Sequence, residues 1–74
     1  MSAERDAKHF GRNLLLARRR HGLSQERLAA RAGLSRDTIY KIEMGTRSPR
    51  LDTLLRLADT LGVDPCELLM GLRP

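Results

Sequence analysis

Aromatic residues are almost absent from this chain of 74 residues, which has one Phe, one Tyr and no Trp. A core in such a chain must be built mainly from Leu, Ile and Ala, and these residues suit packed helices. The sequence also lacks the period-two alternation of polar and apolar residues that is typical of a strand. We therefore expect an all-α fold in a single small domain that spans residues 1–74.

Several kinds of site lack the residues that they need. Cys66 is the only cysteine, which excludes an internal disulfide framework. Its spacing from His9 and His21 fits no zinc-binding pattern. The sequence also suggests no third residue that would orient a histidine beside Cys66, as a catalytic Cys–His pair requires. The longest apolar run, residues 14–17, is too short to span a membrane, and no apolar signal core follows the N-terminal Met. We expect no metal, no cofactor, no small-molecule effector site, no membrane association and no enzyme activity.

Positive charge is plentiful and unevenly spread. The chain has a formal net charge of +5, with 14 Lys and Arg against 9 Asp and Glu. Twelve of the basic residues but only five of the acidic ones lie in residues 1–50, so the excess is concentrated there. A basic balance of this kind favours a polyanionic partner such as double-stranded DNA.

Apolar residues recur with helical spacing along the whole chain. After a mainly polar stretch (residues 1–6) that we expect to be disordered, the pattern predicts helices at 7–21, 25–32, 36–44, 51–61 and 65–70. The expected buried stripe of the first helix is Phe10, Leu14, Ala17 and His21. The expected buried stripe of the fourth is Leu51, Leu54, Leu55, Ala58 and Leu61, and in the fifth Leu68 and Leu69 point inward.

Residues 24–44 have the layout of a helix-turn-helix motif. Ser24 and Ser35 are good N-caps, and Gly33 between the two helices tolerates the positive φ of a sharp turn. Ala29 is small enough for a close helix crossing, and Ile39 and Ile42 anchor the second helix. This places five residues on its outer face, where basic side chains can reach guanine in a major groove: Arg36, Asp37, Tyr40, Lys41 and Met44.

Three blocks of the sequence, residues 23–29, 33–45 and 49–63, resemble the Cro/cI-type helix-turn-helix family, also called XRE or lambda-repressor-like. The resemblance implies a compact five-helix domain that binds a pseudo-palindromic operator as a homodimer. It also implies a transcriptional regulator, for example a repressor, in the cytoplasm of a bacterium or encoded by a phage or plasmid. Two alternatives within the family are the antitoxin of a toxin–antitoxin pair and the controller of a restriction–modification system.

The resemblance also assigns roles to residues. Those on the recognition helix 36–44 that contact bases are Arg36, Asp37, Lys41 and Tyr40. Those that contact the DNA backbone are Gln25, Ser35, Thr38, Thr46, Arg47 and Arg50. Arg18 and Glu43 are expected to form a structural ion pair between the first and third helices.

Some roles stay open from the sequence. Asp37 can accept from cytosine, pair with Lys41 one turn on, or complement the positive end of its helix. Tyr40 can contact a phosphate, lie against a thymine methyl group or shield the junction between two helices. A dimer interface is expected at Leu69, Met70 and Leu72, whereas Leu15 and Leu16 suit either the core or an interface.

Overall fold

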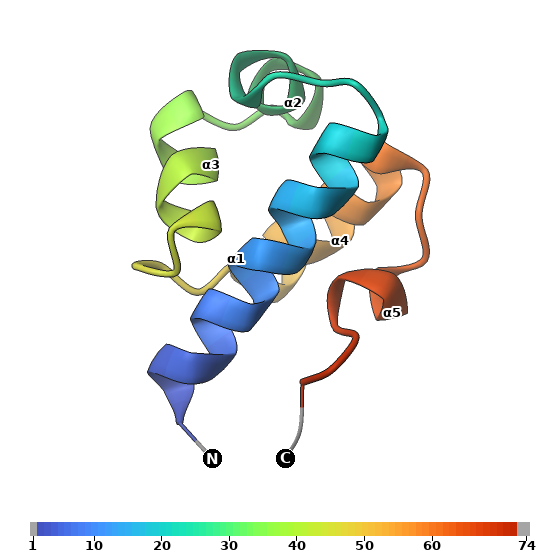
Figure 1. Cartoon of the computed structure of the whole chain (residues 1–74). Helices are drawn as coiled ribbons and strands as arrows, with labels where there is room; N and C mark the ends of the chain where they lie inside the picture. The colour runs from blue at the N-terminus through green and yellow to red at the C-terminus, as the bar shows by residue number, and fades with distance from the viewer. Residues whose placement is uncertain (1, 73–74) are drawn as a thin grey trace.

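The computed structural model describes residues 2–72, and these form five helices with no strand (Figure 1). The helices are α1 (Ala3–Arg20), α2 (Gln25–Ala32), α3 (Arg36–Glu43), α4 (Leu51–Leu61) and α5 (Pro65–Leu68). In Figure 1, α1 crosses the molecule diagonally with α4 behind it, while α2 and α3 lie together at the top and left. The all-α prediction is confirmed.

All five helices contribute to one hydrophobic core. Its largest fully buried side chains are Leu14, Leu28, Ile39, Ile42, Leu57 and Leu68. Full burial of one such side chain stabilises a fold by about 1.5–3 kcal/mol, so these few residues carry much of the stability of a small domain. The single Phe10 joins them with only 3% of its surface exposed.

The first helix begins earlier than the sequence suggested. The Ser2 hydroxyl accepts a hydrogen bond from the backbone N–H of Arg5 at 3.3 Å and so caps a helix that starts at Ala3. Acidic residues in the first turn complement the positive end of the helix. The expectation of disorder over residues 1–6 is therefore wrong from Ser2 onward, and Met1 lies outside the described residues.

Three other helix ends also differ from the prediction by one or two residues. α1 ends at Arg20, and His21 is its exposed C-cap rather than part of the buried stripe. α3 ends one residue early, with Met44 as its C-cap. α5 ends two residues early, so Leu69 is a C-cap that is 40% exposed and does not point inward.

The buried face of α4 is rotated relative to the predicted one. Leu51 and Leu55 are 73% and 48% exposed, whereas Leu57, which the predicted stripe omitted, is fully buried. The apolar residues of α4 form one continuous face over about half of the helix, and the structure buries the edge of that face that contains Leu57. The positions of α2 and α5, which both contact α4, decide which edge is buried.

The start of α5 depends on a carboxylate. Asp64 accepts a hydrogen bond from the backbone N–H of Cys66 at 2.8 Å, in the N-cap position before Pro65. That hydrogen bond favours the ionised carboxylate and lowers the pKa of Asp64. The same carboxylate raises the pKa of the Cys66 thiol, chiefly through their side-chain contact, so the protonated thiol is favoured.

The Asp64 cap should make part of the stability pH-dependent. A carboxylate whose pKa is lowered by folding stabilises the fold above its unfolded pKa of about 3.9, and this is lost as the pH falls through the lower folded pKa. Asp64→Asn retains a capping oxygen that does not titrate. Between about pH 6 and pH 3, its melting temperature in circular dichroism should therefore fall less than that of the wild type. Asp59→Asn removes an exposed carboxylate from α4 and serves as control; parallel curves for wild type and Asp64→Asn would contradict the prediction.

Candidate nucleic-acid interface

The helix-turn-helix geometry is set by two serine caps and one glycine. The Ser24 hydroxyl accepts from the N–H of Arg27 at 3.1 Å, and the Ser35 hydroxyl accepts from the N–H of Thr38 at 3.0 Å. Between them Gly33 ends α2 with φ of 70°, in the left-handed region that favours glycine. Both helices therefore begin at the predicted residues, with α3 turned back against α2.

The inner face of α3 is held by the core and by an unexpectedly close approach of α1. Ile39 and Ile42 are fully buried. A Cβ atom at Gly11 would overlap the carbonyl oxygen of Ile42 and lie 2.7 Å from that of Glu43. The sequence did not reveal this contact, because a glycine inside a helix indicates only a local weakness until its neighbour is known.

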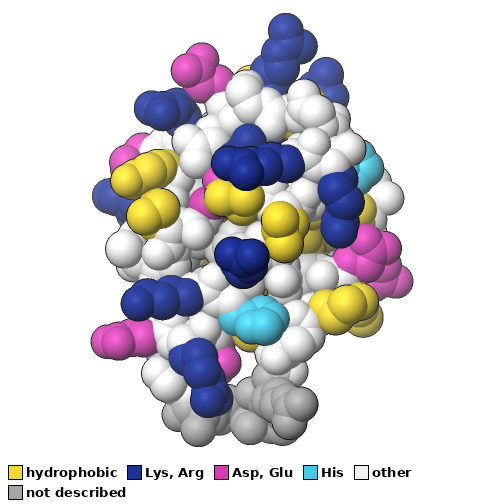
Figure 2. All heavy atoms as spheres, viewed as in Figure 1, with side chains coloured by type: hydrophobic (Ala, Val, Ile, Leu, Met, Phe, Trp, Pro, Cys, Tyr) yellow, Lys and Arg dark blue, Asp and Glu magenta, His cyan; other side chains and the backbone are white. Residues whose placement is uncertain are grey.

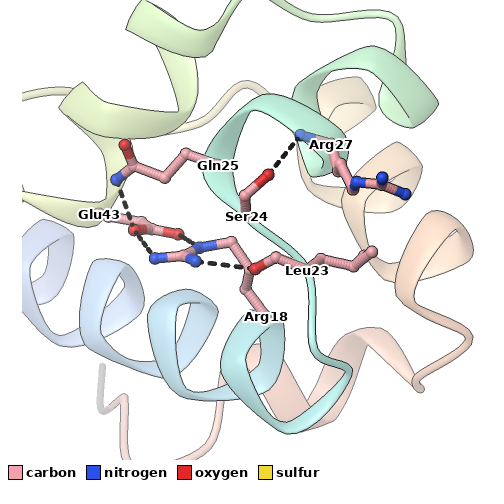
Figure 3. Close-up of polar contacts among 6 residues, drawn as sticks. All are labelled: Arg18, Leu23, Ser24, Gln25, Arg27 and Glu43. Carbon is pink, nitrogen blue, oxygen red and sulfur yellow. Dashed lines mark hydrogen bonds and ion pairs between the residues drawn. The ribbon is translucent and has the colours of Figure 1, made fainter.

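A buried ion pair ties α3 to the end of α1 (Figure 3). Arg18 donates from Nε to Oε2 of Glu43 at 2.6 Å and from Nη2 to Oε1 at 3.0 Å, and their side chains are 11% and 1% exposed. Hydrogen bonding to Glu43 raises the pKa of Arg18. The predicted pair is thus present, and its bidentate geometry is the strong form of this contact.

Two further hydrogen bonds extend this network to the start of α2. Arg18 Nη1 donates to the carbonyl of Leu23 at 2.9 Å, and Gln25 Nε2 donates to Oε1 of Glu43 at 2.9 Å. The amide of Gln25 therefore supports α3. Its amide oxygen is directed away from Glu43 in Figure 3. Helices α1, α2 and α3 thus meet at the carboxylate of Glu43.

The outer face of α3 presents the predicted residues to solvent. Arg36, Asp37, Tyr40 and Met44 are exposed and Lys41 is half-buried. Lys41 Nζ lies 3.1 Å from a carboxylate oxygen of Asp37, in the acid-first order that stabilises a helix. Two of the three alternatives for Asp37 are present in the DNA-free protein: it pairs with Lys41, and it lies in the first turn of α3, where it complements the positive end of the helix.

The loop after α3 brings hydroxyl and guanidinium groups beside the start of that helix. Arg47 Nη1 donates to Oγ1 of Thr38 at 3.4 Å, and the Thr38 and Ser35 hydroxyls lie 2.8 Å apart. The Thr46 hydroxyl donates to the carbonyl of Lys41 at 3.2 Å, which fixes the loop to α3. Such groups are the usual donors to phosphate oxygens.

Arg50 lies at the far end of the same loop and opens α4 without a side-chain cap. Its Nε lies 3.5 Å from the carboxylate of Asp52, and both side chains are exposed. A shallow depression joins it to Arg47; the residues that line it are Thr38, Ile42, Arg47, Ser48, Pro49, Arg50 and Thr53. The two guanidinium groups thus flank one edge of α3.

The predicted dimer residues lie directly after α5. Leu69 and Met70 are 40% and 67% exposed, whereas Leu72 is partly buried against the core. The carbonyl of Met70 accepts hydrogen bonds from His9 Nε2 and Asn13 Nδ2, both at 2.8 Å. These two polar residues of α1 therefore hold the chain after α5, a role that the sequence did not indicate.

The two leucines left open by the sequence differ in exposure. Leu15 is half-buried, whereas Leu16 is 42% exposed and faces a shallow depression that Met70 also lines.

Within residues 2–72, no group of three His, Cys, Asp or Glu side chains is placed to hold a metal ion. None of the helices in that range combines the length and apolar character needed to cross a membrane.

Comparisons with known proteins agree with this geometry. Residues 14–68 match the helix-turn-helix family model HTH_3. The chain is 43% identical over 61 residues to y4dJ of Sinorhizobium fredii, named as an uncharacterized HTH-type transcriptional regulator; the match covers 82% of this chain and 79% of that protein. This chain is also 45% identical over 47 residues to the control protein C.BamHI of Bacillus amyloliquefaciens. That match covers 64% of this chain and 58% of C.BamHI.

Among solved structures, the restriction–modification controller protein C.AhdI of Aeromonas hydrophila is similar, with a TM-score of 0.83 and 41% identity. The match covers 85% of this chain and 96% of that protein. This chain therefore belongs to the HTH_3, or XRE-type, family of helix-turn-helix transcriptional regulators, as its sequence blocks indicated.

Proposed function

We propose that this protein is a sequence-specific DNA-binding regulator that lays α3 in a major groove and acts in the cytoplasm without catalysing a reaction. The observation that carries the proposal is the outer face of α3. It presents Arg36, Asp37, Tyr40, Lys41 and Met44 to solvent, while two isoleucines, a close glycine contact and a buried ion pair hold its inner face. A rigid, exposed helix of this kind is what direct readout requires.

Contacts to the DNA backbone would position this helix. Gln25, Ser35 and Thr38 lie at the starts of α2 and α3, and the loop after α3 supplies Thr46, Arg47 and Arg50. These groups lie on either side of the outer face of α3 and suit phosphate contacts, which set register rather than sequence preference. In the bound state, Gln25 would keep its hydrogen bond to Glu43, and its amide oxygen or remaining N–H would face the DNA backbone.

We propose a homodimer that binds two half-sites related by two-fold symmetry, because operator symmetry mirrors protein symmetry. Leu69 and Met70 are suitable interface residues: Met70 lines one depression with Leu16, and Leu69 lines another with Leu72. Leu72 would contribute less, since part of its surface already packs on its own core. Figure 2 shows exposed hydrophobic side chains over α1 and toward α5.

A controller of restriction–modification genes is the specific role that the comparisons favour. Both C.BamHI and C.AhdI are named as controller proteins, and C.AhdI is matched over 96% of its length. The fold therefore agrees with such a role for this chain.

Selection of bound sequences from a random pool of DNA duplexes tests the proposed function. We expect a defined motif made of two inverted half-sites whose centres lie about one helical turn, 34–36 Å, apart. The affinity for that motif should fall linearly with salt on a log–log plot because phosphate contacts release counterions. Recovery of sequences without any shared motif would contradict the proposal.

Arg36→Ala should relax base preference at one position of each half-site. A bidentate contact from Arg to guanine discriminates by about 1–3 kcal/mol, so affinities for the selected site and for that single-base variant should converge. Arg47→Ala is the matched control: it should weaken all sites similarly and lower the salt slope by about one. An equal loss on every sequence for Arg36→Ala would show that Arg36 contacts only phosphate.

A further inference from the structure

The outer face of α3 is not uniformly basic. Tyr40 is 47% exposed and Met44 is 54% exposed, and they are neighbours one helical turn apart. Single exposed apolar residues are ordinary on protein surfaces, but these two adjoin on the helix proposed to enter the groove. Figure 2 shows hydrophobic side chains between basic ones at the left edge of the molecule, over α3.

The charges beside these two side chains largely cancel. Asp37 and Lys41 pair at 3.1 Å, so together they add no net charge to the face. Among the charged side chains of this face, Arg36 alone has no ion-pair partner within residues 2–72. The face therefore offers one available cation and a continuous apolar surface formed by Tyr40 and Met44.

In a major groove, the apolar group on a standard base edge is the C5-methyl of thymine. A thioether or aromatic ring placed against the other edges would remove water from donors and acceptors without replacing their hydrogen bonds, which is unfavourable. Thymine methyl groups are thus the complement of this surface.

We propose that Tyr40 and Met44 are specificity-determining residues that read thymine methyl groups in the operator, alongside guanine recognition by Arg36. This inference rests on the proposed function and adds to it the base feature that the apolar residues recognise. It also assigns a role to Met44, which lies at the C-cap of α3.

Single replacement of each thymine in the selected duplex by deoxyuridine tests the proposal, because it removes one methyl group and preserves base pairing. Binding of the full chain would be measured by fluorescence anisotropy. We expect about fourfold weaker binding at one or two thymines per half-site, the effect of one buried methyl group, and no change at the others.

Protein variants assign the sensitive positions to side chains. Met44→Ala and Tyr40→Ala should each abolish the deoxyuridine effect at one position, while Tyr40→Phe, which keeps the ring, should retain it. Leu55→Ala removes an exposed leucine of similar size from α4 and should leave the whole profile unchanged. Arg36→Ala should also retain the methyl effects, since the guanine contact is separate.

The outcomes separate this inference from the proposed function. A defined DNA motif with no deoxyuridine effect at any thymine would overturn the methyl readout and leave the DNA-binding proposal standing. Methyl effects that persist in both alanine variants would also overturn it, because other residues would then be responsible. Failure to select any motif would overturn the proposed function and this inference together.

Discussion

Glu43→Ala is expected to destabilise the protein by about 3–5 kcal/mol, since it leaves the Arg18 guanidinium largely buried without its partner. The substitution also removes the acceptor of Gln25, so α2 and α3 lose a shared contact. For a domain of this size, each kcal/mol lowers the melting temperature by about 4–8 °C. The melting temperature, measured by circular dichroism alongside the wild type, should therefore fall by more than about 12 °C.

A double variant distinguishes the loss of a partner from the loss of packed volume. Arg18→Met combined with Glu43→Leu replaces the ion pair by apolar side chains of similar size. It should be far more stable than Glu43→Ala, because neither charge remains buried alone. An unchanged melting temperature for Glu43→Ala, or equal losses for both variants, would contradict this account of the network.

Gly11→Ala is expected to destabilise the fold by about 1–3 kcal/mol or more, against the usual direction for such a change. Replacement of glycine by alanine inside a helix ordinarily stabilises by about 1 kcal/mol. Here the new Cβ would overlap the backbone carbonyl of Ile42, and backbone cannot move aside as a flexible side chain can. The steric effect should therefore exceed the gain in helix propensity.

Arg12→Ala is the control for the stability change that Gly11→Ala causes. Arg12 is the exposed neighbour of Gly11 on α1, and its replacement should change the free energy of unfolding by less than about 0.5 kcal/mol. Gly11→Ala should also weaken DNA binding, because separation of α1 from α3 displaces the recognition helix. A rise in the denaturant midpoint for Gly11→Ala would show that the two helices tolerate a wider spacing.

Local signals predicted the helix starts and the turn of the helix-turn-helix motif. Ser24 and Ser35 begin their helices at the expected positions, and Gly33 forms the turn, because capping and positive φ depend on only a few adjacent residues. The outward position of Arg36 and Tyr40 followed from the spacing of the buried isoleucines. The pairing of Arg18 with Glu43, distant in sequence, came from the family resemblance and not from periodicity.

Other features required the neighbouring elements. Leu55 and Leu57 lie at opposite edges of the broad apolar face of α4, so which of them is buried depends on where α2 and α5 lie. Two other contacts join positions far apart in the chain. Gly11 lies against the backbone of Ile42, and His9 and Asn13 donate hydrogen bonds to the Met70 carbonyl. No local pattern encodes such distances.

The amino-acid sequence by itself determined the five helices, the turn within residues 24–44 and the set of side chains on the outer face of α3, because periodicity and capping are local properties. Only the tertiary structure decided which apolar residues remain exposed. It also decided how closely α1 approaches α3. These outcomes depend on distances between side chains and between helices, which follow from assembly of the whole core.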